Sequence, residues 1–284
     1  MPELVLLRAA ASALLPRRPP PEYPLHLERV GVRAEPGRVA AYARVCRARH
    51  VDPLPVLYPH VLAFGLTMRL MSRRDFPFPA PGLVHVHDVV TQRRPIGRTD
   101  PLDLLVTFST PRPHRRGHVV DVHTDVSTGG RLVWSQRSTY LRRETRARGT
   151  AAPSTTDDDT ADWPAIDRWP AGPATGRRYA SVSGDHNPIH LTTLTARPFG
   201  FPRAIAHGMW TTARALSSLL PDPDGAVRVS VDFVSPVALP TTLLLVRAPS
   251  GDRFAVRSPG GRVHVKGTLA IQDDAGRQDA ASSI

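Results

Sequence analysis

A carboxylic acid and an imidazole stand five positions apart in the stretch 179–190, YASVSGDHNPIH, as Asp185 and His190. Gly184 and the Asn187-Pro188 pair are turn formers, so we expect a loop here rather than a helix face. An Asp and a His on such a loop can hold one water between them. The carboxylate accepts its proton, and the imidazole orients the water or relays the second proton. This spacing therefore predicts acid–base chemistry without a covalent nucleophile.

The same residues have plainer interpretations. Residues 185–188 could form only an Asx-type turn, with His190 filling the wall of a pocket. His186 and His190 are four positions apart, which on a helix would suggest a pair of metal ligands. Pro188 argues against that helix and no third ligand is apparent in the sequence, so we expect no metal.

The elements that would position this loop occur twice along the chain. The segment 207–220 has apolar residues at helical spacing and stops at Pro221. The segment 56–71 has the same character. Four strand-like segments follow each predicted helix, at 84–92, 103–110, 118–127 and 131–142 in the first half and 227–237, 241–248, 253–257 and 262–271 in the second.

Short matches between the halves support a duplication. Tyr42-Ala43-Arg44-Val45 matches Tyr179-Ala180-Ser181-Val182, His60 matches His207, and Pro95-Ile96 matches Pro236-Val237. A long helix with an antiparallel sheet curled around it describes the α+β hotdog fold, in which two units pair their sheets edge to edge. We therefore predict a double hotdog within one chain.

Composition sets the predicted boundaries. Residues 146–170 are poor in periodic apolar residues and rich in Thr, Asp and Pro, which is typical of a linker. We expect an N-terminal arm at 1–20 containing a short docking helix at 4–15, a first hotdog at 21–145, the linker at 146–170, a second hotdog at 171–275 and a tail at 276–284.

The motif Tyr-x-x-x-Ser-Gly-Asp-x-Asn-Pro-Ile-His resembles the hydratase motif of the MaoC-like dehydratases and (R)-specific enoyl-CoA hydratases. Ala206-His207-Gly208-Met209 and the segment 232–237 (DFVSPV) are also similar to that family, and the likeness covers roughly residues 165–272. Residues 57–64 and 92–96 resemble, more loosely, the degenerate first repeat of double-hotdog members.

The resemblance implies reversible dehydration of (3R)-hydroxyacyl thioesters to trans-2-enoyl thioesters, with no metal, nucleotide or redox cofactor. Asp185 and His190 would be the catalytic pair, acting on the Cα proton and on the β-hydroxyl or water. The backbone N–H of Gly208, at the start of a helix, would be the oxyanion hole for the thioester carbonyl. The residues implied to shape the loop or contact the substrate are Gly184, Asn187, Pro188, His207 and Met209. Of these, we expect His207 to pack or cap rather than to ionise.

The first half lacks these features. Ungapped alignment on the tyrosines places Ala48 opposite Asp185 and Pro53 opposite His190, and alignment on the histidines places Val61 opposite Gly208. We therefore predict one active site per chain. The first half would supply the other wall of an acyl tunnel through Met68, Met71, Phe76 and Phe78, and Trp210 could line it too.

Two other functions remain open. Hotdog thioesterases also polarise a carbonyl at a helix N-terminus, and they would release free thiol without a change in enoyl absorbance. A non-catalytic partner subunit would shape a tunnel for another hotdog protein, but the intact Asp185 and His190 weigh against it.

The net charge of +12 suggests an anionic partner. No basic run is interleaved with aromatic residues, however, so we expect no nucleic acid. The family resemblance implies an acyl-CoA or acyl carrier protein thioester as the partner. The single cysteine, Cys46, excludes an internal disulfide and favours the cytoplasm. No apolar run is long enough for a membrane span. Monomer and homodimer are both compatible with a two-hotdog chain.

Overall fold

The computed structural model describes residues 26–143, 159–220 and 225–272. The predicted N-terminal arm with its docking helix, the first part of the linker, Pro221 and the tail lie outside these residues. Within them, eleven strands form one antiparallel sheet. In chain order they are β1 (His26–Val32), β2 (Leu83–Gln92), β3 (Leu102–Phe108), β4 (Arg112–His114), β5 (Gly117–Thr128), β6 (Arg131–Arg143), β7 (Ala165–Ala171), β8 (Ala226–Phe233), β9 (Thr241–Arg247), β10 (Arg253–Arg257) and β11 (Val263–Gln272).

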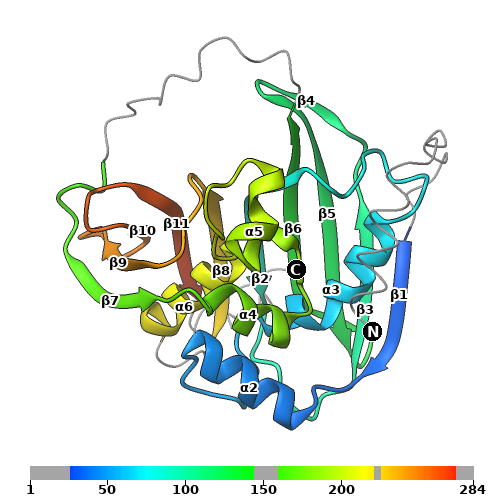
Figure 1. Cartoon of the computed structure of the whole chain (residues 1–284). Helices are drawn as coiled ribbons and strands as arrows, with labels where there is room; N and C mark the ends of the chain where they lie inside the picture. Colours follow the sequence, from blue (N-terminus) through cyan, green and yellow to red (C-terminus); the bar gives the residue numbers. More distant parts are fainter. Residues whose placement is uncertain (1–25, 144–158, 221–224, 273–284) are drawn as a thin grey trace.

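The strand order shows the duplication. From one edge to the other the order is β1-β3-β5-β6-β2-β8-β11-β10-β9-β7, and β4 pairs only with β5. Reading inward from either edge gives the same sequence of equivalent strands, and the halves join where β2 pairs antiparallel with β8, from His87↔Asp232 to Gln92↔Val227. Figure 1 shows the two halves next to each other. The predicted α+β double hotdog is confirmed.

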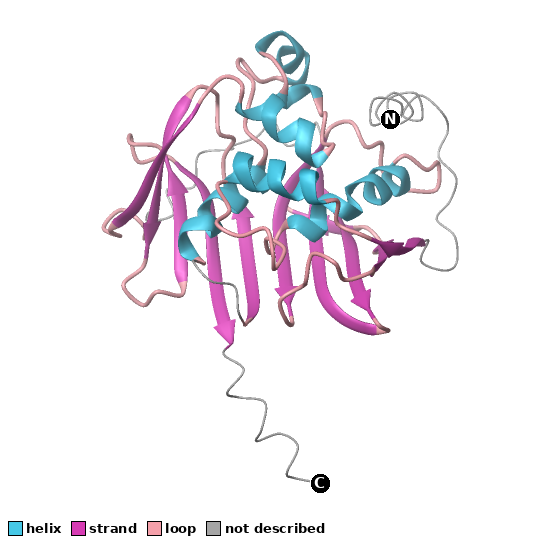
Figure 2. Ribbon diagram, turned by 90° about the horizontal axis from the view of Figure 1, so that it is seen from below, coloured by secondary structure: helices cyan, strands magenta, loops and turns pink. Residues whose placement is uncertain are grey.

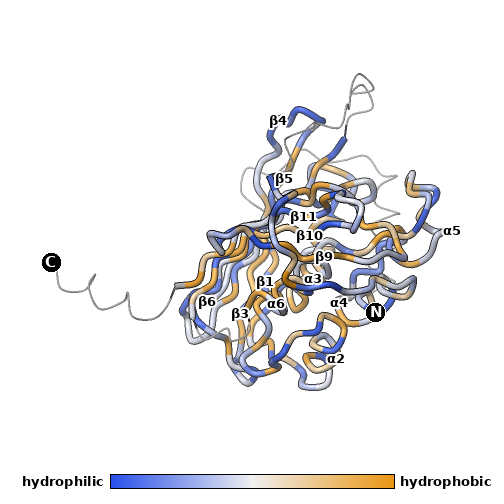
Figure 3. Tube along the Cα trace, turned by 90° about the vertical axis from the view of Figure 1, so that its left-hand side faces the viewer, coloured by the Kyte–Doolittle hydropathy of each residue, from blue (hydrophilic) through white to orange (hydrophobic). Residues whose placement is uncertain are grey.

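The helices cover one face of the sheet, as Figure 2 shows. They are α2 (Pro36–Cys46), α3 (Tyr58–Met71), α4 (Thr175–Ser183), α5 (Thr193–Ala196) and α6 (Gly208–Leu219), with the 3₁₀ turns η1 (Pro188–His190) and η2 (Arg197–Phe199). No helix in the described part of the chain is long and apolar enough to cross a membrane. Apolar stretches run through the layer between helices and sheet, whereas the β4 tip is hydrophilic (Figure 3).

Polar anchors tie the layers together. The indole N–H of Trp134 in β6 donates to the Val56 carbonyl at 2.8 Å, just before α3. The indole N–H of Trp210 donates to the Val45 carbonyl at 3.1 Å, which ties α6 of the second half to α2 of the first. Buried indole groups that find such partners cost little free energy.

Three expectations need correction. Residues 165–170, assigned to the linker, belong to edge strand β7, which pairs with β9; an edge strand tolerates Pro170 because one of its sides needs no partner. The stretch 179–183, expected in a loop, ends α4, and the turn begins only at Gly184, whose φ of 80° is left-handed. The strand predicted to run to Val237 stops at Phe233.

Candidate active site

The loop between α4 and η1 is held by its own side chains. The carboxylate Oδ1 of Asp185 accepts from the backbone N–H of Asn187 at 3.1 Å, and the side chain of Asn187 caps η1 by accepting from Ile189 N at 3.4 Å. The Asx-type turn and a chemical role are therefore compatible, because the other oxygen of Asp185 stays free of the turn. Asp185 keeps 25% of its side-chain surface exposed, so a ligand can reach it.

Three of the singled-out residues meet at this loop: Asp185, His190 and His207. The imidazoles of His190 and His207 stack with centroids 3.7 Å apart and an angle of 26° between their planes. Nδ1 of His190 lies 2.8 Å from the Ile205 carbonyl oxygen. A carbonyl only accepts, so Nδ1 carries the hydrogen and Nε2 presents a lone pair. The same reasoning makes Nε2 of His207 the donor to the Asp185 carbonyl at 3.0 Å.

Burial and mutual electrostatics set the protonation states. Burial lowers the pKa of His190, and burial together with the neighbouring His190 lowers the pKa of His207 to about 3. Burial alone would raise the pKa of Asp185, but His207, His190 and the Asn187 N–H together hold it below its ordinary value. At neutral pH the centre therefore holds one carboxylate beside two neutral imidazoles.

A potential ligand atom of each of these three residues lies within 4.8 Å of the others. A carboxylate with two imidazoles is a known metal-binding set. Here, however, the rings stack rather than converge on one point, and the Nε2–H of His207 is engaged by a carbonyl. The arrangement suits a water or hydroxyl between Asp185 and His190 better than a metal ion, and we retain the prediction of no metal.

Gly208 is the first residue of α6. Its N-cap, His207, is extended (φ −66°, ψ 137°) and supplies no side-chain cap, so the N–H groups of the first turn remain available for an anion. A Cβ on Gly208 would lie 2.5 Å from Cε1 of Phe233. Glycine at position 208 is therefore required for Phe233 to pack against the start of the helix. The next residue, Met209, which was also named from the sequence, is buried.

The first half contacts this loop through α3. Met71 and Phe76, expected to line an acyl tunnel, belong to the hydrophobic core that both halves share, where Phe76 packs edge-on against Phe108 with centroids 5.0 Å apart. Met68 and Phe78 pack against the same core. Phe64 of α3 lies at the Asp185 loop, 3.8 Å from the place a Cβ on Gly184 would take.

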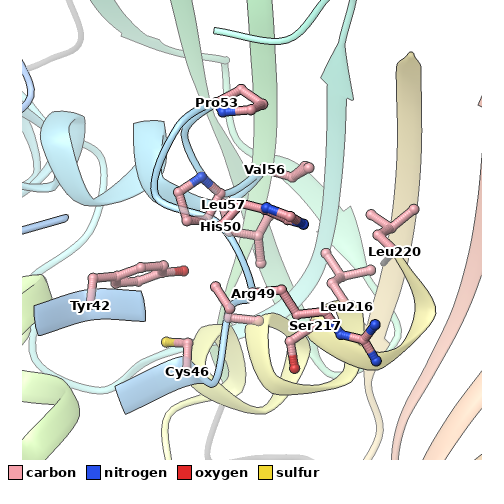
Figure 4. A pocket seen from close by; sticks show the side chains of 13 residues that line it. Tyr42, Cys46, Arg49, His50, Pro53, Val56, Leu57, Leu216, Ser217 and Leu220 are labelled. Carbon is pink, nitrogen blue, oxygen red and sulfur yellow. The ribbon is translucent and has the colours of Figure 1, made fainter. Parts of the chain in front are cut away.

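The positions in the first half that align with Asp185 and His190 line a small cavity of about 50 Å³. Ala48 contributes to it. Pro53, Tyr42, Cys46 and residues near the C-terminal end of α6 complete the lining (Figure 4). Burial raises the pKa of the Cys46 thiol to about 12, so no thiolate forms there. The residues that line this cavity include no carboxylate.

The chain is similar to known proteins in both sequence and fold. A family model described as "MaoC like domain" matches residues 146–258. A 3-hydroxyacyl-thioester dehydratase X of Mycobacterium tuberculosis is 42% identical over 241 residues, 84% of this chain and 85% of that protein. An enoyl-CoA hydratase ChsH3 of the same organism is 27% identical over 184 residues, 61% and 64% of the two chains. The crystal structure of HtdX from this organism superposes with a TM-score of 0.76 at 36% identity, covering 87% of this chain and all of that one.

Proposed function

Since this chain belongs to the MaoC-like dehydratase family, we propose that it catalyses the reversible dehydration of (3R)-hydroxyacyl thioesters to trans-2-enoyl thioesters. One observation carries the proposal: the side chains of Asp185 and His190 meet at His207, the residue that precedes the uncapped start of α6. The relatives named as a 3-hydroxyacyl-thioester dehydratase and an enoyl-CoA hydratase support the reaction class. The (R) configuration rests on the resemblance of the loop motif.

The chemistry follows from the protonation states. In the dehydration direction the lone pair on Nε2 of His190 accepts the Cα proton. Charge then develops on the thioester oxygen, where the N–H of Gly208 donates to it. The imidazolium, stabilised by the Asp185 carboxylate, returns the proton to the β-oxygen as the carbon–oxygen bond breaks. One enoyl thioester and one water are formed, and His190 is again neutral.

The proposal places one such centre in each chain. Residues 165–272 of the second half hold the catalytic loop and α6, and the first half contributes a supporting wall. Gly184, Asn187 and Pro188 shape the loop. The side chain of His207 is 2% exposed, and its Nε2 donates to the backbone carbonyl of Asp185, which positions that residue. Either coenzyme A or an acyl carrier protein would carry the acyl group, and the exposed arginines suit the anionic character of both.

The test is to follow enoyl-thioester absorbance with purified full-length protein and crotonyl-CoA or a longer trans-2-enoyl-CoA. Asp185→Asn and His190→Ala should each lower kcat by about 10²-fold or more, and the product should be the (3R)-hydroxyacyl thioester. Release of free thiol without loss of the enoyl would favour a thioesterase. Absence of any activity across chain lengths and carriers would favour a non-catalytic partner subunit.

A further inference from the structure

A buried carboxylate lies in β2, the strand through which the first half joins the second. Asp88 of β2 is 2% exposed. It accepts from Nε2 of Gln136 at 3.0 and 2.9 Å and from the Ser138 hydroxyl at 2.8 Å, and Nε2 of His85 lies 3.5 Å away. Desolvating a carboxylate costs several kcal/mol, and an apolar residue at such a position is often more stabilising. The first half lacks the catalytic residues of the second, so its own candidate site gives no reason for this cost.

The residues around Asp88 reach the catalytic centre from two sides. On one side, the His60 ring lies 5.9 Å from that of Phe64, which reaches the catalytic loop. On the other, the His85 ring lies 4.7 Å from that of Phe233, which packs on Gly208. Burial lowers the pKa of His60, and the charge of Asp185 is among the groups that partly offset this; burial raises the pKa of Tyr140, and the charges of Asp88 and Asp185 raise it further. This polar cluster therefore belongs to the surroundings of Asp185.

The carboxylate fixes the direction of every hydrogen bond in the cluster. Because Asp88 only accepts, Gln136 must turn its NH₂ toward it, which leaves Oε1 facing Nδ1 of His60 at 2.9 Å. Nδ1 of His60 therefore carries the hydrogen. Burial lowers the pKa of His60, so the ring is neutral and its Nε2 is a lone pair. Ser138 likewise donates its hydroxyl hydrogen to Asp88.

We propose that Asp88 sets up an acceptor subsite at Nε2 of His60 that binds the hydroxyl group of the substrate or the water that adds to the enoyl thioester. The inference rests on the proposed function and adds a binding role for the first half. A water that points one hydrogen at Nε2 of His190 has in this subsite an acceptor for its other hydrogen. Asp88 and Gln136 are positioning residues, and they act through His60.

Binding measurements test the subsite without relying on turnover. In full-length Asp185→Asn protein, the Kd of (3R)-hydroxybutyryl-CoA should be about fivefold lower than that of butyryl-CoA, which corresponds to one net hydrogen bond. Adding Asp88→Asn, which keeps the size and removes the charge, should reduce the preference to less than twofold. The Kd of butyryl-CoA should stay the same.

Asp121→Asn is the matched control. Asp121 of β5 is also buried and accepts from Thr139 and Arg112, but side-chain alternation puts Thr139 on the opposite sheet face from Ser138 and Tyr140. This variant should keep the preference for the hydroxylated ligand. If Asp88→Asn does not fold, His60→Phe removes the acceptor and should also abolish the preference. An unchanged preference in the folded Asp88→Asn or His60→Phe protein, or no preference in the Asp185→Asn parent, would overturn the proposal.

Discussion

Gly176 lies in the first turn of α4, where the backbone of His190 passes closer than any side chain allows. A Cβ built there would lie 1.9 Å from the His190 carbonyl oxygen, 2.9 Å from its carbon and 3.4 Å from its Cα. Those atoms are backbone, so no rotamer change relieves the clash. For Gly176→Ala the carbonyl must retreat by about 1.5 Å to reach an ordinary contact. Displacing a catalytic group by about 1 Å typically costs about 10²-fold in rate, and we expect kcat for crotonyl-CoA hydration to fall by about that factor.

Stability separates this effect from unfolding. Overpacking typically costs about 1–3 kcal/mol, while alanine in place of glycine inside a helix returns about 1 kcal/mol. Thermal unfolding should therefore show a folded protein with a modestly lower Tm. Gly172→Ala is the matched control, because a Cβ there meets nothing within 4 Å. If folded Gly176→Ala keeps kcat within threefold of the unsubstituted protein, the idea that this close approach positions His190 is wrong.

Four further predictions concern pH, metal and packing. His207 is buried with a pKa of about 3, so below pH 6.5 the unfolded chain binds a proton at this residue that the folded chain does not. The free energy of unfolding, measured with urea, should therefore fall by about 2 kcal/mol between pH 6.5 and 5. In the His207→Gln variant this decrease should be smaller. The pKa values of Asp185 and His190 are both lowered, so kcat/KM should be flat through neutrality and decrease only on the acid side of a pH–rate profile. Dialysis against a chelator should leave the hydration rate unchanged, because Asp185 and His190 need no metal for the proposed steps. Trp134→Phe should cost about 1–2 kcal/mol in unfolding free energy by removing the donor to Val56.

Periodicity and internal matching were sufficient to predict the duplicated architecture. The apolar spacing of 207–220 and 56–71 placed both long helices within two residues of their observed starts. The edge strands β1 and β7 were missed because neither alternates cleanly. Four of the seven residues of β1 are exposed in succession, and β7 contains Pro170 and a register shift. Such strands form because a neighbouring strand offers hydrogen bonds, which local sequence does not report.

The site was predicted in part. The types and spacing of residues 184–190 singled out the loop. The stacking of His207 on His190, however, depends on how the start of α6 meets η1, and the two histidines lie 17 positions apart in sequence. The tunnel wall was assigned to Met68, Met71, Phe76 and Phe78 by their apolar character alone. A bulge between His85 and His87 breaks the alternation that would otherwise have marked Asp88 as facing inward.

The antiparallel joint between β2 and β8 explains why the first half keeps a polar interior. In this pairing the start of β2 lies against the end of β8, so His85 and Asp88 come close to Phe233 and α6 of the other half. The Asp185 loop is contacted from the first half by Phe64 of α3. The loop of the first half, with Ala48 and Pro53, lines only a small cavity that α6 of the second half also lines. A single hotdog would provide the acid–base pair without the opposite wall, so the two halves together form the smallest unit that can complete the proposed site.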